Sequence, residues 1–201
     1  MNKQYLIYLD SLPKLINFVE SSNYDDKQKI RCQKLNTIPP IIAFDKEIGG
    51  ILSEIRLTYI YGCFYCSILG ASAFGERILN KLILDLRSYY PQNKYLQVKE
   101  SIYRCSSFTN WKIMLDALIE WNIIDDTLRA NFESLSDERH RCVHYNDRLL
   151  EYTDEQILNI IKLISGIVIS LFAMSKYCKL ENGKYIVNKP KDFFYDIYYK
   201  L

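Results

Sequence analysis

The sequence has few of the residues from which phosphate-binding loops are built. It contains seven glycines and five prolines among 201 residues, and no segment matches GxGxxG or GxxxxGK[ST]. Those loops need glycine so that backbone N–H groups can approach a phosphate closely. Nucleotide hydrolysis of the P-loop kind is therefore excluded.

An excess of charge of one sign is also missing. Lys and Arg together number 26 and Asp and Glu 24, so the formal net charge is +2. A nearly neutral chain gives no support to strong nonspecific binding of nucleic acid or of a membrane surface. Any anion-binding site must therefore be local.

Cysteine is too sparse for a disulfide scaffold. The six cysteines lie well below the roughly 8–10% that marks such chains. The first residues, MNKQYLIYLDSLPK, lack the uninterrupted apolar stretch and the small-residue cleavage site of a signal peptide. We expect reduced thiols and a cytoplasmic protein that is not bound to a membrane.

The residues that are present predict a folded, helical chain. Hydrophobic residues make up 49% of it, and its length is near that of one domain, which we expect to span residues 1–201. Apolar residues recur three and four positions apart instead of alternating. We predict an all-α fold, an antiparallel bundle of about five or six helices. Helices are expected over residues 5–19, over residues 51–90 with a bend near Gly70 to Gly75, and after Asn110, Asp125 and Thr153.

Three regions are expected outside these helices. Residues 21–50 contain the breakers Pro39-Pro40 and Gly49-Gly50 and predict a loop-rich connector. Asn182-Gly183, between short apolar runs, predicts a small hairpin within the C-terminal aromatic tail, residues 178–201. This tail either covers the bundle or docks on a partner.

The segment from Leu57 to Gly75 carries no charge over 19 residues, close to the roughly 20 that cross a bilayer. Its Tyr, Gly, Ser and Cys content favours a buried central helix instead, with Gly62, Cys66 and Gly70 as a small-residue face. Cys63-x-x-Cys66 then places two small residues in the core, although the spacing also occurs in zinc and redox sites.

The two histidines of the chain lie within five positions, in Arg139-His140-Arg141-Cys142-Val143-His144. One interpretation is a metal site, since His140 and His144 share a helix face, but the adjacent arginines would repel a dication. A second is a solvated helix end with ion pairs such as Asp137 with Arg141. A third is a phosphodiester site, because Arg offers a planar fork to phosphate and imidazole exchanges protons near neutral pH.

Arg139-x4-His144, with the polar His140 directly after the arginine, resembles the R-x(4–6)-H motif of HEPN domains. The helix from Trp111 to Trp121 and the turn from Ile123 to Asp125 are similar to what these proteins place before the motif. A further similarity is the helix opening over residues 73–77. The resemblance covers roughly residues 50–175.

This resemblance implies a helical bundle that forms a homodimer, joins two motifs across the two-fold axis and cleaves RNA without a metal ion or other cofactor. Many such proteins are toxins or effectors of phage defence and stress, and act with an antitoxin or a partner defence protein. His144 would be the general base or acid, and Arg139 would hold the scissile phosphate. His140, Arg141, Tyr145 and Asn146 would orient the RNA or contact its phosphates.

Two points qualify this interpretation. In a subset of these toxins a partner nucleotidyltransferase modifies a Tyr two positions after the motif histidine, where this chain has Asn146, so we do not expect that regulation. Residues five apart on a helix differ by about 140° in direction, so Arg139 and His144 cannot share one face of a regular helix.

The alternative function is a noncatalytic HEPN-like module that binds nucleotide or RNA, or serves as a scaffold for a partner protein.

Overall fold

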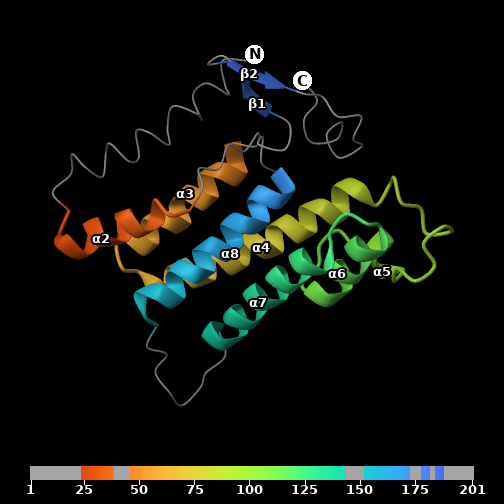
Figure 1. The fold of residues 1–201 in the computed structure, drawn as a ribbon. Coiled ribbons are helices and arrows are strands. Elements are labelled where there is room, and N and C mark those ends of the chain that lie inside the picture. The colour runs from red at the N-terminus through yellow and green to blue at the C-terminus, as the bar shows by residue number, and fades with distance from the viewer. Residues whose placement is uncertain (1–23, 39–45, 144–151, 173–177, 182–183, 188–201) are drawn as a thin grey trace. The chain divides into compact units, whose positions relative to one another are not determined.

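The structure, a computed structural model, describes residues 24–38, 46–143, 152–172, 178–181 and 184–187. Within these residues the chain forms seven helices and one two-stranded antiparallel sheet, in the order shown in Figure 1. The predicted all-α class is therefore confirmed. The helix expected over residues 5–19 lies outside the described residues.

The chain forms two compact units. The first comprises Met1–Cys63 and Val168–Leu201, and the second comprises Phe64–Ile167. The single domain expected over residues 1–201 stays a prediction.

In the first unit, helix α2 (Asp26–Leu35) lies where a loop-rich connector was expected over residues 21–50. Asp25 accepts a hydrogen bond from the backbone of Gln28, whose side chain accepts one from the backbone of Asp25. This capping box satisfies two backbone donors at the start of a helix. The connector prediction is therefore wrong for residues 26–35, and also for residues 46–50, where helix α3 (Lys46–Ile60) begins.

The chain leaves α3 through a turn at Gly62, whose φ of +76° suits glycine better than any residue with a Cβ. Helix α4 (Phe64–Leu86) then runs without interruption through Gly70 and Gly75. The bend expected near Gly70 to Gly75 is therefore wrong, and the break lies at Gly62. Gly62 is outside α4 and Cys66 is exposed, so the expected small-residue helix face is also wrong.

Strands β1 (Cys178–Glu181) and β2 (Lys184–Val187) pair antiparallel, with Glu181 opposite Lys184. The predicted hairpin around Asn182-Gly183 is thus confirmed for its two strands. The remainder of the aromatic tail, residues 188–201, lies outside the described residues.

In the second unit, α4 packs against α6 (Trp111–Glu120) and α7 (Asp126–Val143), and α6 also contacts α7 and the short α5 (Ser101–Arg104). Three predicted helix starts are confirmed by their caps. Asn110 accepts from Ile113 N–H, Asp125 from Leu128 N–H and Thr153 from Gln156 N–H at the start of α8 (Asp154–Phe172).

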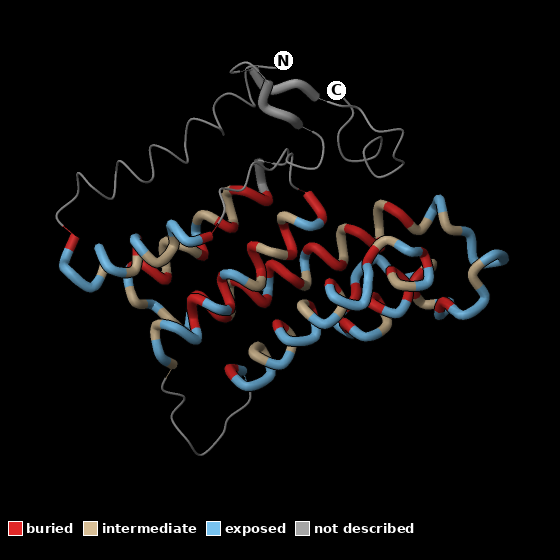
Figure 2. Tube along the Cα trace, viewed as in Figure 1, coloured by how far each residue is buried: buried red, intermediate tan, exposed pale blue. Residues whose placement is uncertain are grey.

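The core of this unit is apolar and continuous along α4, whose buried residues run from Ser67 to Leu86 (Figure 2). Three fully buried side chains, Phe132, Leu135 and Met114, extend this core from α7 and α6. Among the described helices, α8 is long and apolar enough to cross a membrane, which is weak evidence because core helices share these properties. The uncharged segment from Leu57 to Gly75 is divided between α3 and α4.

Candidate functional site

Arg139 lies on the face of α7 that packs against α4. The buried residues of this helix are Leu128, Phe132, Leu135 and Cys142, and position 139 continues their spacing of three and four. One interpretation of the sequence placed a solvated helix end here. That expectation is wrong for Arg139, because α7 continues through Ser136–Val143 and turns the residue toward α4.

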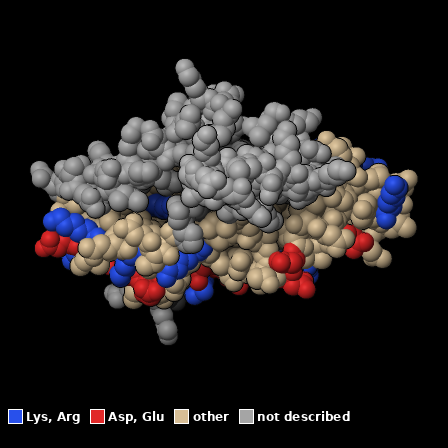
Figure 3. All heavy atoms as spheres, turned by 45° about the horizontal axis from the view of Figure 1, so that its top comes forward, with Lys and Arg blue, Asp and Glu red and all other residues tan. Residues whose placement is uncertain are grey.

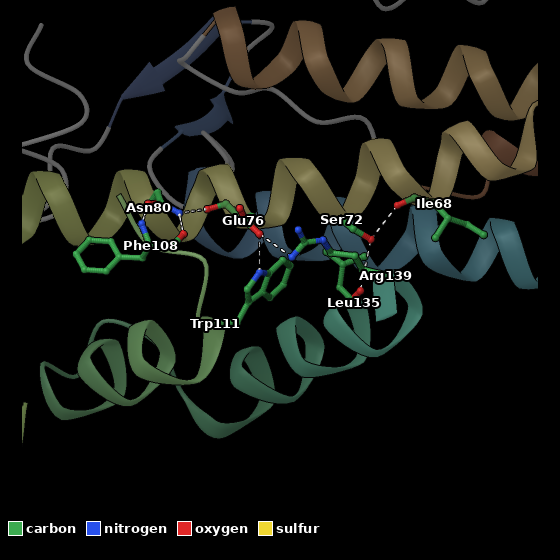
Figure 4. A network of polar contacts seen from close by, with 8 residues as sticks. All are labelled: Ile68, Ser72, Glu76, Asn80, Phe108, Trp111, Leu135 and Arg139. Carbon is green, nitrogen blue, oxygen red and sulfur yellow. Dashed lines mark hydrogen bonds and ion pairs between the residues drawn. The ribbon is translucent and has the colours of Figure 1, made fainter. Parts of the chain in front are cut away.

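The guanidinium of Arg139 is held by Glu76 of α4. Nη1 of Arg139 donates to Oε2 of Glu76 at 2.8 Å, and the same oxygen accepts a hydrogen bond from Nε1 of Trp111 at 3.1 Å. Figure 4 shows Arg139 and Trp111 pointing from α7 and α6 toward this carboxylate. One carboxylate oxygen therefore joins three helices.

Further polar contacts fix α4 on both sides of Glu76. One turn later, Asn80 accepts from the backbone N–H of Phe108 at 2.7 Å and donates to its carbonyl at 2.8 Å. One turn earlier, the buried hydroxyl of Ser72 lies 2.8 Å from the carbonyl of Ile68 and 3.5 Å from that of Leu135 (Figure 4). Glu76 thus sits on a stretch of helix whose position is well determined.

The site is only partly covered. The Arg139 side chain is 40% exposed and that of Glu76 23%, whereas Trp111 is buried. The contact with Glu76 uses Nη1, and a guanidinium has five N–H donors in a planar fork. Arg139 is therefore both oriented by the protein and accessible to a ligand from solvent.

The neighbouring residues of the motif face outward. His140 and Arg141 are exposed, and Arg141 donates to Glu138 at 2.6 Å. The ion pair with Asp137, expected from the sequence, is replaced by this pair one residue later. The Arg141 side chain is 57% exposed and that of Glu138 20%, so the arginine is accessible from solvent while its partner is largely covered.

The last described turn of α7 contacts the residue that precedes α8. The thiol of Cys142, which is buried, lies 3.4 Å from the hydroxyl of Tyr152. Burial, and next the hydrogen bond with Cys142, raise the pKa of Tyr152 above its ordinary value. This contact ties together the two ends of the segment over residues 144–151.

His144, Tyr145 and Asn146 lie within that segment and outside the described residues. The structure therefore places Arg139, His140 and Arg141 of the predicted site and brings Arg139 to Glu76. In the part of the chain that is described, no group of three or more His, Cys, Asp or Glu side chains could hold a metal ion. Cys63 and Cys66 are exposed, so their expected place in the core is wrong.

The charged surface supports a local site instead of a broad basic face. In the view of Figure 3, Lys and Arg side chains of the described residues lie among Asp and Glu side chains. On α7 itself, Arg129 pairs with Asp116 at 2.8 Å and with Glu133 at 2.9 Å. A phosphate that approached this helix would therefore meet individual arginines and not a continuous basic face.

Sequence reasoning missed the partners of Arg139. Glu76 belonged to the helix opening over residues 73–77 that resembles HEPN domains, but its pairing with Arg139 was not predicted. Trp111 was named only as the start of a helix. The sequence did contain a clue, because Glu76 is an acidic residue within an apolar stretch of helix. In the structure Gly75 and Ile78 on either side of it are buried, and an acidic residue in such a place needs a partner.

Comparison of the chain with protein-family models, with curated proteins and with solved structures finds no match. The resemblance to HEPN domains consequently rests on the residues of the motif and its surroundings.

Proposed function

We propose that the protein is a metal-independent endoribonuclease of the HEPN type, with Arg139 and His144 as its catalytic residues. The observation that carries this proposal is the state of Arg139. Its guanidinium is oriented by Glu76 at 2.8 Å and still 40% exposed, as a phosphate-binding group must be. His144 follows five residues later, one position beyond the last residue of α7.

The chemistry follows from these two residue types. A neutral imidazole removes the proton of a ribose 2′-hydroxyl, and the 2′-oxygen forms a bond to phosphorus. The bond from phosphorus to the 5′-oxygen breaks, and that oxygen takes a proton from an imidazolium. The products are a 2′,3′-cyclic phosphate and a 5′-hydroxyl, and Arg139 stabilises the negative charge that develops on the phosphate oxygens.

One chain contributes a single R-x4-H motif, whereas this reaction uses a base, an acid and cationic help. A homodimer that joins two motifs supplies all three, so the proposal includes a two-fold dimer as the active form. We also propose that the protein acts as a toxin or defence effector, together with an antitoxin or a partner protein.

The test is a cleavage assay with mixed cellular RNA in EDTA. We expect cleavage by the wild type and by Arg104→Ala, which removes an exposed arginine of α5 outside the motif, and none by His144→Ala. RNA carrying 2′-O-methyl groups should remain intact, because the nucleophile is blocked. Binding of RNA without cleavage would favour the noncatalytic module instead, and cleavage that requires a divalent ion would refute the mechanism.

A further inference from the structure

The pairing of Arg139 with a carboxylate bears on which phosphates the site accepts. We infer that Glu76 is a positioning and specificity-determining residue, which lowers the preference of the site for doubly charged terminal phosphates over singly charged phosphodiesters. This inference rests on the proposed function, because it concerns the ligand of the same arginine. It involves contacts between α4, α6 and α7 within one compact unit.

The first step concerns position. A long arginine side chain on an exposed helix face samples many rotamers, and ordering it on ligand binding costs entropy. Here Glu76 Oε2 accepts from Arg139 Nη1, while Trp111 Nε1 donates to the same oxygen and restrains the carboxylate. Trp111 is 6% exposed and makes a T-shaped contact with Phe132 of α7, at a centroid distance of 6.2 Å and an interplanar angle of 73°. The packed Trp111 side chain therefore restrains the Glu76 carboxylate, and the carboxylate in turn restrains the guanidinium of Arg139.

The second step concerns charge. The pair of Arg139 and Glu76 has no net charge, so an incoming phosphate meets an attractive guanidinium and a repulsive carboxylate behind it. Both interaction energies are proportional to the charge on the phosphate. A phosphodiester, with one negative charge, gains its hydrogen bonds from the exposed donors at a small repulsive cost. For a terminal phosphate, with two charges near pH 8, the attraction and the repulsion both double, so the carboxylate removes twice as much binding energy as it removes from a diester.

Selection of this kind has a use in an enzyme that cuts within RNA chains. The inner phosphates of RNA are diesters, whereas free phosphate, mononucleotides and phosphorylated chain ends carry dianions. A bare arginine would favour the dianions, which are competitive inhibitors. Glu76 reduces that preference while it keeps Arg139 in place.

The test compares the wild type with Glu76→Gln. Glutamine retains an oxygen that accepts from Arg139 and Trp111, so position is kept while the charge is removed. The probes are inorganic phosphate and dimethyl phosphate at pH 8 and low salt, with binding followed through amide and indole ¹H–¹⁵N signals. Glu133→Gln is the matched control, because it removes one carboxylate that pairs with another arginine of the same helix, Arg129.

We expect Glu76→Gln to bind inorganic phosphate about tenfold more tightly than the wild type, and dimethyl phosphate about threefold, since the effect on the dianion is the square of that on the monoanion. Glu133→Gln should match the wild type, and adding Arg139→Gln to Glu76→Gln should abolish the gain. Equal gains for both probes, or no gain, would overturn the inference.

If Glu76→Gln fails to fold, a second measurement on the wild type alone still tests the inference. Because the pair has no net charge, inorganic phosphate should bind no more than about threefold more tightly than dimethyl phosphate, and a larger preference for inorganic phosphate would overturn the inference. Neither arm depends on turnover. A wild type that cuts RNA without this selectivity defeats the inference alone, and one that shows the selectivity without cutting RNA defeats the proposed activity alone.

Discussion

Glu76 Oε2 lies 2.8 Å from Arg139 Nη1, across 63 positions of sequence, and makes the motif arginine part of the packing between α4 and α7. The arginine therefore has a structural partner in the absence of any ligand. Substitutions at this residue should change stability as well as function, and the two effects can be separated by choosing the replacement.

Arg139→Ala should lower the free energy of unfolding by about 1 kcal/mol, because it leaves the partly buried Glu76 without its cationic partner. Arg104→Ala, on a pair with Glu100 in which both side chains are more than half exposed, should change it by less than about 0.5 kcal/mol. Urea unfolding followed by circular dichroism measures both. Equal, negligible changes would show that the pair with Glu76 adds nothing to stability.

Asn80→Asp should destabilise the protein by about 1–3 kcal/mol, because a carboxylate cannot donate to the carbonyl of Phe108 or to that of Glu76. Asn110→Asp is the control. Asn110 uses its side chain as a helix cap that accepts from Ile113 N–H, a role that Asp fills equally well. Thermal unfolding of the two variants should differ clearly, and similar midpoints would contradict the role assigned to Asn80.

Gly75→Ala tests how closely α4 approaches its neighbours beside Glu76. A Cβ there would lie 2.7 Å from Leu135 Cδ2 and 3.0 Å from Trp111 Cη2. The overpacking costs about 1–3 kcal/mol, which outweighs the gain of about 0.5–1 kcal/mol in helix propensity.

Gly166→Ala is the matched control for that substitution. Among the described residues nothing lies within 4 Å of a Cβ at position 166, so only the propensity gain remains. Denaturant midpoints should therefore move in opposite directions. A Gly75→Ala protein as stable as the wild type would show that Leu135 and Trp111 yield without cost.

Tyr152 gives the stability of the protein a dependence on pH. Its pKa is raised in the folded state by burial and by the contact with Cys142, whereas an unfolded tyrosine titrates near 10. The stabilisation is fully present below about pH 10 and is lost as the pH rises through the higher folded value. The difference in unfolding free energy between the wild type and Tyr152→Phe should therefore shrink above about pH 10. A constant difference between pH 8 and pH 11 would contradict this assignment.

Complementation tests the proposed composite site. When inactive His144→Ala is mixed with inactive Arg139→Ala, some mixed dimers should regain partial RNA cleavage, because each copy supplies the group that the other lacks. Both variants should first be shown to be folded at the assay temperature. A fully active wild-type monomer, at concentrations where light scattering detects no dimer, would refute the composite site.

The sequence by itself determined the helical class, the hairpin strands and the starts of three helices. These features depend on contacts within a few positions, as when Asn110 caps Ile113 or Thr153 pairs with Gln156. Spacing and side-chain chemistry are sufficient where a residue and its hydrogen-bond partner are near neighbours. The same signal was present at Asp25 and Gln28, where the surrounding polar residues favoured a loop instead.

Tertiary structure alone decided the break at Gly62 and the partner of Arg139. At Gly62 a Cβ would lie 2.8 Å from Nη1 of Arg31 on another helix, which the local sequence does not reveal. The motif also gave no indication that α7 turns Arg139 inward, since several carboxylates were equally available along the chain. Packing of α6 and α7 on α4 brings Trp111 and Arg139 to Glu76, where one oxygen of the partly buried carboxylate accepts from both donors.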